Sequence, residues 1–431
     1  MTAAPTTGPD ATTEQAALDA DGSDPGWREL FVVPPAEGGP YPQAAYLVGN
    51  SLGLQPVATR ADILADLDSW GRFGVEGFFD GERPWQSYPQ RFAASMAGLI
   101  GAGPAETVIM NSLTVNLHLM MASFYRPRGE RVRIVVEDNT FPSDSYAVRS
   151  QARWHGLDPD DAVVRLRPRP GEHHLRTDDV VDLLRREGPT VALVLLGAVN
   201  YHSGQLMDIP AITRATREAG AVSGWDLAHA AGNIPLQLHD WDVDFAVWCM
   251  YKYLNSGPGA PGGAFVHERH VDDPAMPRLE GWWGTDAAVR FRMDAIPQPP
   301  PTADAWQVST PSALGLSPMR AALDLFETVG MTTLRERSIR LTGYLERVLD
   351  DIAASRPLTV ITPRDPQQRG CQLSVRIDQG DAGEVARRLR HEHGVITDFR
   401  EPDIVRAAPV PLYSTYHDCW RFADALTRLL P

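Results

Sequence analysis

The sequence predicts an α/β protein with a mostly parallel sheet, followed by a smaller α+β domain near the C-terminus. Short apolar runs alternate with helix-like segments through the middle of the chain, and this alternation is typical of a parallel sheet with helices on both faces. Residues 191–196 (VALVLL) are a continuous apolar run, as expected of a strand that is buried on both faces. Towards the C-terminus, two strand-like runs flank a helical stretch, and this pattern predicts the smaller domain.

The elements of the larger domain follow from hydrophobic spacing and from the residues that end each run. Helical spacing predicts helices at residues 61–73, 113–125 and 209–219. Gly220 supplies a C-terminal stop for the last of these helices. Apolar and β-branched runs predict strands at residues 132–137, 191–196, 222–225, 243–249 and 264–267.

The two ends of the chain differ in composition from its middle. Residues 1–26 are rich in Ala, Thr, Asp and Gly, and we interpret them as a disordered lead-in. A large domain is expected at residues 27–310, with an N-terminal arm that contributes to the small domain. The small α+β domain is expected at residues 311–431. Its predicted elements are a long helix at 318–352, strands at 371–377 and 405–408, and a helix at 382–393.

Charge and composition exclude several classes of partner. The net charge is −15, from 40 basic and 55 acidic side chains, and such a surface repels nucleic-acid phosphates. No apolar stretch approaches the roughly 20 residues that a membrane helix needs, and residues 1–26 do not resemble a signal peptide. We therefore expect a cytoplasmic protein that binds neither nucleic acid nor membrane. Because the cysteines are far apart and odd in number, we expect no disulfide framework and no metal site; they are Cys249, Cys371 and Cys419.

Lys252 is the only lysine of the chain, since the other 39 of the 40 basic residues are arginines. A lysine that survives in such a composition suggests a task that a guanidinium cannot perform. Acting as a neutral amine nucleophile is such a task, because arginine cannot be deprotonated in proteins. On composition alone, chance survival is an equal alternative, and the surroundings of Lys252 decide between the two.

Asp226, His229 and Lys252 follow predicted strands, where parallel sheets collect their functional groups. A carboxylate at a buried strand end needs a partner. The ring nitrogen of pyridoxal 5′-phosphate is suitable, because a carboxylate that keeps it protonated makes the cofactor an electron sink. Lys252 lies 26 residues after Asp226, ahead of a glycine-rich loop, which is the spacing of aminotransferase-like pyridoxal enzymes. The alternatives are a capping aspartate beside a core histidine, and an exposed surface lysine.

Nine stretches of the chain, in order and with few gaps, resemble the kynureninase family over residues 27–431. They are YLVGNSLGLQP (46–56), MNSLTVNLHLMM (110–121), FPSDSYAVRSQ (141–151), NYHSGQLMDIPAIT (200–213), DLAHAAGNIPLQLHDWDVDFAVWCMYKYLNSGPG (226–259), GWWG (281–284), LTGYLE (341–346), RGCQLS (369–374) and RAAPVPLY (406–413). The block at 226–259 is the most specific. The resemblance implies the aspartate-aminotransferase-like fold, fold type I of the pyridoxal-phosphate enzymes, with the cofactor held on Lys252 as a Schiff base.

The resemblance also implies a set of cofactor-binding residues. Leu113 and Thr114, at a helix start, would hold the phosphate, and Phe141 would stack on the pyridine ring. Trp282 and Thr310 would reach the cofactor from the partner subunit of a homodimer, whose active sites lie at the subunit interface. The complete expected set is Leu113, Thr114, Phe141, Pro142, Ser143, Asp144, Asp226, His229, Tyr251, Lys252, Trp282 and Thr310.

The reaction of the resembled family is hydrolytic cleavage of the Cβ–Cγ bond of L-kynurenine, which yields anthranilate and L-alanine. Lys252 would move the α-proton, and water would add to the side-chain carbonyl. Tyr251 is our hypothesis for the general acid and base that acts on the resulting gem-diol. Arg406 would bind the α-carboxylate of the substrate with its bidentate fork. The other residues expected to contact the substrate are Asn50, Ser51 and Phe78.

Two positions depart from the eukaryotic pattern of the family. Thr310 stands where an asparagine is expected, and Phe78 stands where a histidine is expected. Both would touch the aromatic ring of the substrate, and recognition of a ring hydroxyl needs a hydrogen-bond partner. The substitutions therefore predict a preference for kynurenine over 3-hydroxykynurenine. The alternative is an enzyme for a 3-hydroxylated or ring-substituted kynurenine in a biosynthetic pathway.

Other classes of protein fit the sequence less well. A cysteine desulfurase needs a reactive cysteine on a mobile loop, whereas Cys249 and Cys371 lie in apolar, strand-like runs. A non-catalytic descendant of the fold would not be expected to keep Lys252, Asp226 and Arg406 together. A nicotinamide-dependent dehydrogenase would carry a GxGxxG loop after a strand, and the sequence has none.

Overall fold

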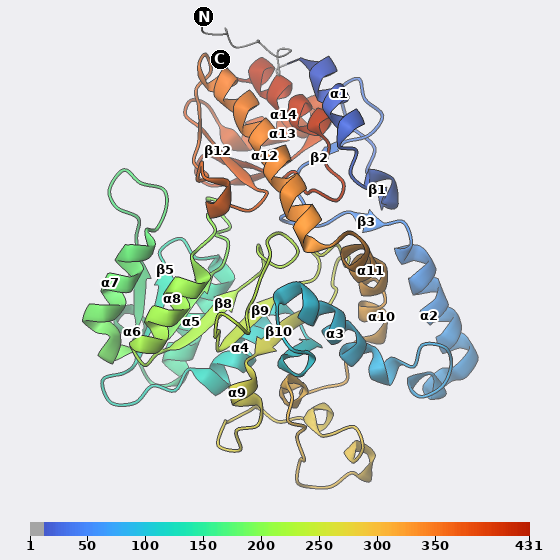
Figure 1. The fold of residues 1–431 in the computed structure, drawn as a ribbon, viewed down its shortest axis with the longest axis vertical. Helices are drawn as coiled ribbons and strands as arrows, with labels where there is room; N and C mark the ends of the chain where they lie inside the picture. The colour runs from blue at the N-terminus through green and yellow to red at the C-terminus, as the bar shows by residue number, and fades with distance from the viewer. Residues whose placement is uncertain (1–12) are drawn as a thin grey trace, which may run out of the picture. The chain divides into compact units, whose positions relative to one another are not determined.

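The structure is a computed structural model that describes residues 13–431 and divides into two compact units (Figure 1). The large unit comprises residues 58–201 and 205–331, and the small unit comprises the described part of residues 1–57 together with residues 202–204 and 332–431. The division thus falls after Met331, whereas the sequence places it after residue 310. The intervening helices α10 (Ala313–Leu316) and α11 (Met319–Val329) pack on helices α2 (Thr59–Phe73) and α3 (Tyr88–Ile100) of the large unit.

The large unit is built on a seven-stranded sheet, which confirms the predicted α/β fold class. The strand order is β4 (Thr107–Met110), β10 (Gly262–Val266), β9 (Phe245–Trp248), β8 (Val222–Asp226), β7 (Val191–Gly197), β5 (Arg133–Glu137) and β6 (Val163–Leu166). The strands from β9 to β6 are all parallel, whereas β10 runs antiparallel to both of its neighbours. The sheet is therefore mostly parallel, and the carboxyl ends of β8, β7 and β5 meet at one edge.

Helices cover both faces of this sheet because the central strands are apolar on both sides. Successive side chains of β7 alternate between the faces, so Leu193 and Leu195 join a core with Leu117 and Val148, from helices α4 and α5. Helices α7 and α8 pack against each other, and α8 lies against β8. The helices of the large unit, besides α10 and α11, are α2 (Thr59–Phe73), α3 (Tyr88–Ile100), α4 (Leu113–Phe124), α5 (Pro142–Trp154), α6 (Pro159–Ala162), α7 (Thr177–Glu187), α8 (Ile209–Glu218) and α9 (Glu268–Val271).

The small unit contains a four-stranded antiparallel sheet in the order β11 (Leu358–Val360), β12 (Leu373–Ile377), β15 (Ile404–Ala407) and β14 (Asp398–Arg400). Its apolar core includes Leu345 from helix α12, Leu389 from α13 and Phe422 from α14. These helices are α12 (Met331–Ala353), α13 (Ala382–His393) and α14 (Tyr416–Leu429). Four two-residue strands complete the described strands: β1 (Phe31–Val32) with β3 (Gln55–Pro56), and β2 (Ala45–Tyr46) with β13 (Val395–Ile396).

Two sequence predictions about the small unit need correction. Part of the expected disordered lead-in is helix α1 (Glu14–Ser23), which packs on α14 and buries Ala17; residues 1–12 lie outside the described residues. The side chain of Thr13 accepts a hydrogen bond from the Ala16 amide and so caps this helix. The long helix expected at 318–352 is two helices, because Gly330 adopts a φ of 79° and interrupts it between α11 and α12. Among residues 13–431, no helix is long and apolar enough to cross a membrane.

Candidate active site

A pocket in the large unit gathers nine of the predicted cofactor residues at the carboxyl edge of the parallel strands. Strand β8 ends at Asp226, and the segment after β9 supplies Tyr251 and Lys252. The starts of helices α4 and α5 form the opposite wall. The predicted residues that line this pocket are Leu113, Thr114, Phe141, Ser143, Asp144, Asp226, His229, Tyr251 and Lys252.

The single lysine of the chain lies inside this pocket rather than on the surface. Lys252 Nζ donates a hydrogen bond to His229 Nε2 at 3.2 Å. The same nitrogen lies 5.7 Å from the centroid of the Phe141 ring, and the edge of Tyr201 contacts this ring at 5.3 Å between centroids. A primary amine beside an exposed aromatic face can bond to a planar heterocycle that stacks on that face, as pyridoxal phosphate requires.

Asp226 is positioned by the backbone that follows its strand. Its Oδ1 accepts a hydrogen bond from the Ala228 amide at 2.7 Å, and the residue is buried. The neighbouring carboxyl group of Asp144 lies so deep that burial raises its pKa well above the usual value, and the charge of Asp226 raises it further. The surroundings of Asp144 therefore favour its protonated form, and Asp226 is the carboxyl group expected to face the ring nitrogen of the cofactor.

The opposite wall of the pocket suits a phosphate group. Helices α4 and α5 begin there, and their capping positions, Ser112 and Phe141, make no side-chain hydrogen bond to the first amides. The hydroxyl groups of Thr114 and Ser143, one from each helix, lie 2.7 Å apart. Unsatisfied amides at a helix start bind anions, so these residues fit the phosphate of the cofactor.

Tyr251 enters the pocket as a phenol. Burial raises its pKa, and interaction with Cys249 raises it further. A tyrosine in such surroundings keeps its proton throughout the neutral range and can donate it to a developing oxyanion.

The remaining predicted residues lie outside this pocket. Pro142 is the first residue of α5, next to the pocket wall. In the large unit, Trp282 is 44% exposed and contacts Trp283 and Phe291, while Phe78 packs on Trp85 with 5.4 Å between ring centroids. Thr310 is partly buried.

Asn50, Ser51 and Arg406 belong to the small unit. Arg406 is buried, and its Nε donates to Asp398 Oδ1 at 2.6 Å, while its Nη2 donates to Asp398 Oδ2 and, at 3.2 Å, to Ser51 Oγ. Asn50 Nδ2 donates to Gln372 Oε1 at 3.1 Å. The small unit thus holds three of the predicted substrate residues in place by hydrogen bonds, and the carboxylate of Asp398 fixes the guanidinium of Arg406.

Comparison with known proteins shows which family this arrangement belongs to. The family model of the kynureninase C-terminal domain matches residues 334–426. The kynureninase of Salinispora tropica is 67% identical over 413 residues, which cover 96% of this chain and 96% of that protein. The chain belongs to the kynureninase family. The kynureninase of Koribacter versatilis is 50% identical over 415 residues and covers 96% of this chain and 97% of its own length.

Solved structures support the fold independently of the sequence match. A cysteine desulfurase from Thermococcus onnurineus NA1 superposes with a TM-score of 0.73 at 17% identity, covering 90% of this chain and 94% of that one. The cystine C–S lyase C-DES gives a TM-score of 0.74 at 18% identity, covering 88% and 97%. At such identities the likeness shows the fold alone. Together with membership of the kynureninase family, it confirms the predicted fold type, the enzyme class and pyridoxal phosphate as the cofactor.

Sequence reasoning gave no role to three residues beside the sites of this kynureninase-family chain. Glu137 and Tyr201 line the pocket that holds Lys252, and Asp398 pairs with Arg406. Glu137 could have been noticed as a charged residue that ends a buried apolar strand, as Asp226 does. Asp398 left no local signal, because it meets Arg406 only through strand pairing.

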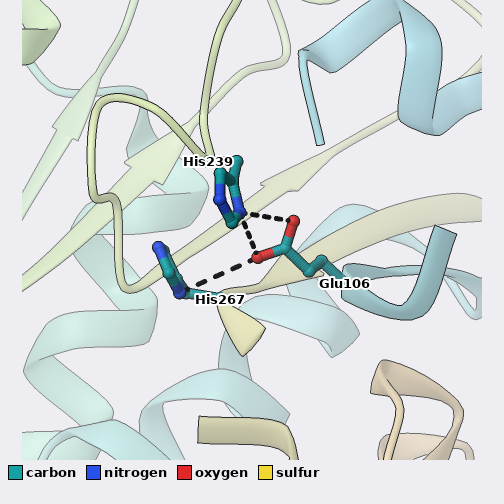
Figure 2. Close-up of side chains that lie close together, drawn as sticks. All are labelled: Glu106, His239 and His267. Carbon is teal, nitrogen blue, oxygen red and sulfur yellow. Dashed lines mark hydrogen bonds and ion pairs between the residues drawn. The ribbon is translucent and has the colours of Figure 1, made fainter. Parts of the chain in front are cut away.

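A second cluster of titratable side chains lies at another edge of the large unit, where Glu106 meets His239 and His267 (Figure 2). Glu106 Oε1 accepts the Glu268 amide and Oε2 accepts the Gly103 amide, both at 2.8 Å. The two imidazole rings stack, with centroids 4.9 Å apart and planes inclined by 18°. Ligand lone pairs lie in the ring plane, so two face-to-face rings cannot both point at one ion. We interpret the cluster as a clamp that joins three segments of the chain.

Proposed function

We propose that this enzyme hydrolyses the Cβ–Cγ bond of L-kynurenine to anthranilate and L-alanine. The observation that carries the proposal is the position of Lys252, the only lysine of a chain of the kynureninase family, inside a pocket with Asp226, His229 and Phe141. A surface lysine would have had no such surroundings.

The residues of the pocket divide the work of this reaction between them. When bound, pyridoxal phosphate supplies a conjugated ring that accepts the electron pair released at the substrate carbon. Lys252 would hold the cofactor and, once released from it, would remove the proton from the substrate α-carbon. Asp226 would keep the ring nitrogen protonated, and the phenol of Tyr251 would transfer a proton at the oxygen of the side-chain carbonyl to which water adds. Arg406 binds the α-carboxylate.

A fluorimetric assay tests the proposal. Anthranilate fluorescence should appear when L-kynurenine is added to enzyme saturated with pyridoxal phosphate, and K252A should abolish it. K252R is the matched control, because it keeps the positive charge but cannot act as a neutral amine. If wild-type enzyme forms no anthranilate, or if K252R turns over normally, the proposal is wrong.

A cysteine desulfurase activity is not favoured, although solved desulfurases share the fold. All three cysteines are free and buried. Burial raises the pKa of Cys249 and raises that of Cys419 well above its usual value, which leaves little thiolate at neutral pH. Free thiols also fit the proposed cytoplasmic location.

The substrate preference that we propose is kynurenine over 3-hydroxykynurenine. Phe78 presents only carbon atoms, and Thr310 has a shorter polar group than the asparagine expected there. A ring hydroxyl that finds no hydrogen-bond partner reduces the stabilisation of the transition state for the hydroxylated substrate. A ring-substituted kynurenine in a biosynthetic pathway is the second candidate, and comparison of kcat/KM for kynurenine, 3-hydroxykynurenine and ring-substituted analogues decides between them.

The enzyme is proposed to act as a homodimer, with Trp282 at the subunit interface. The stretch around Trp282 exposes several large apolar side chains: Leu279, Trp282, Phe291, Met293 and Ile296, with exposed fractions between 44% and 77%. Such a cluster is typical of a surface that a partner covers. Light scattering should give the mass of two chains. If active sites are shared, mixing inactive K252A with inactive W282A should restore part of the activity.

A further inference from the structure

Glu137 and Asp226 flank one glycine at the carboxyl edge of the large sheet. Glu137 ends β5, Asp226 ends β8, and β7 lies between these strands with Gly197 paired to Asp226. A Cβ atom at Gly197 would come within 3.1 Å of Glu137 Oε1, so the carboxyl group of Glu137 lies over the space that this glycine leaves. Both acids line the pocket that holds Lys252. Glu137 is therefore a third carboxyl group of the cofactor site, besides Asp226 and Asp144.

The two oxygen atoms of Glu137 have different surroundings. Oε1 accepts a hydrogen bond from Asn200 Nδ2 at 3.1 Å, and the Gly197 amide also donates to this carboxyl group. Oε2 is buried and finds no hydrogen-bond partner among the described residues, and the residue as a whole is 2% exposed. A carboxylate oxygen that is buried without a donor is strongly disfavoured. The proton of Glu137 accordingly belongs on Oε2.

The charges around Glu137 support the same protonation state. Burial raises the pKa of Glu137 to about 8, and the charge of Asp226 adds to this effect. The other titratable groups of the pocket are Asp144, whose pKa is raised by burial and by the charge of Asp226, with Lys252, His229, Tyr251 and Tyr201. Three ionised carboxylates in one buried pocket would repel one another, whereas a protonated ring nitrogen needs only one carboxylate partner.

We propose that Glu137 is a positioning residue that carries its proton on Oε2 and thereby leaves Asp226 as the one carboxylate offered to the ring nitrogen of the cofactor. The proposal rests on the proposed function of this pocket and goes beyond it, because it assigns a neutral form to an acid that sequence reasoning left without a role. Gly197 contributes to this arrangement, because a side chain at that position would displace the Glu137 carboxyl group.

Cofactor binding tests this proposal without an activity assay. The dissociation constant of pyridoxal phosphate and the absorbance spectrum of the bound cofactor are measured for wild type, E137Q and E137A. Glutamine is neutral and isosteric with the protonated acid, so E137Q should bind within about threefold of wild type near pH 6.5, with an unchanged spectrum. E137A removes the hydrogen-bonding group and should bind about tenfold more weakly, so glutamine rescues what alanine loses.

The pH dependence separates a held proton from a merely structural role. The folded pKa of Glu137 is raised, so wild type loses stability as the pH rises from about 4.5 to 8, whereas E137Q has no carboxyl group to ionise. As the pH rises across this range, the melting temperature of apo-E137Q should therefore increase relative to that of apo wild type. Cofactor burial desolvates Glu137 further, so above about pH 8 wild type should also bind the cofactor progressively more weakly than E137Q.

Each result of the binding and melting measurements either supports or refutes the proposed role of Glu137. If the differences in melting temperature and in dissociation constant between wild type and E137Q stay constant with pH, or if E137Q already binds as weakly as E137A near neutrality, Glu137 acts as a charged group and the proposal is wrong. If E137A matches wild type, Glu137 has no role. Wild-type enzyme that fails to bind pyridoxal phosphate would refute the proposed site itself, which is a separate result.

Discussion

Asp398 and Arg406 face each other directly across the antiparallel strands β14 and β15. The Nε and Nη2 atoms of Arg406 donate to the two carboxylate oxygens of Asp398, so one edge of the guanidinium is fixed in plane. Burial alone raises the pKa of Asp398, but Arg406 outweighs it and holds this pKa below its usual value. Asp398 is therefore a carboxylate at neutral pH, and in the proposed function it would set the direction in which the Arg406 guanidinium meets the substrate carboxylate.

Replacing Asp398 with asparagine should mainly weaken substrate binding. Arg406 is 1% exposed, and a buried guanidinium that loses its charged partner is destabilised by about 3–5 kcal/mol when nothing replaces it. Asparagine keeps one acceptor, so we expect D398N to fold, with KM for L-kynurenine raised about tenfold and kcat changed much less. Steady-state kinetics check this. R376A is the matched control, because Arg376 pairs with Asp378 on the exposed side of the same unit. An unchanged KM in D398N would contradict the role of Asp398.

Tyr251 should matter for the chemical step more than for binding. Its raised pKa means that the phenol stays protonated, so its contribution is the transfer of a proton in the transition state. Y251F is expected to lower kcat by about 10²–10⁴-fold, measured at saturating cofactor so that weaker cofactor binding does not contribute. Solvent isotope effects on kcat should change in the same variant. Normal turnover by Y251F would remove Tyr251 from the mechanism.

Much of the fold could be predicted because apolar periodicity is a local property. Strands β5, β7 and β8 and helices α8 and α13 appear within about two residues of their expected limits, since each is a short run bounded by glycine or polar residues. The break at Gly330 was not foreseen, because both flanking helices continue the same apolar spacing. Helix α1 was not foreseen either, because its stability depends on packing against α14, nearly 400 residues later.

The candidate site could be predicted only where a strand end or a family motif marked it. Asp226 and Lys252 end or follow apolar runs, and the structure brings them into one pocket. Glu137 ends a run of the same kind, but its importance depends on the absence of a side chain at Gly197 in the adjacent strand. The role of Asp398 could not be predicted for a similar reason, because strand register, rather than sequence distance, places it opposite Arg406.

Restoring the residues of the eukaryotic pattern should change the substrate preference. T310N and F78H each reintroduce a polar group where the substrate ring is expected, and the double variant should raise kcat/KM for 3-hydroxykynurenine relative to kynurenine by about 10–100-fold. Competition assays with both substrates measure this ratio. F78L is the matched control, since it alters the shape of the Phe78–Trp85 contact without adding a hydrogen-bonding group. A ratio that rises equally in F78L would show that space, rather than polarity, sets the preference.

The clamp formed by Glu106 and His239 should make stability depend on pH. The hydrogen bond that His239 donates to Glu106 raises the pKa of His239, and this stabilisation is fully present below the unfolded pKa of about 6.5 and is lost as the pH rises through the folded value. Burial raises the pKa of Glu106, but the Gly103 amide, His239 and the Glu268 amide outweigh it and lower the pKa below 4.5. The Glu106 contribution is therefore present above about pH 4.5 and is lost as the pH falls through the folded value.

The pair thus stabilises the fold most between about pH 4.5 and 6.5, and H239Q should lower the unfolding free energy more near pH 6 than near pH 8.5. Because the His239 side chain is 39% exposed, the effect of its charge should stay below about 1 kcal/mol and shrink in high salt. Denaturant titrations at the two pH values measure it, and a double-mutant cycle with E106Q isolates the pair from the amide contacts of Glu106. A coupling energy that is equal at both pH values would mean that His239 packs there as a neutral ring.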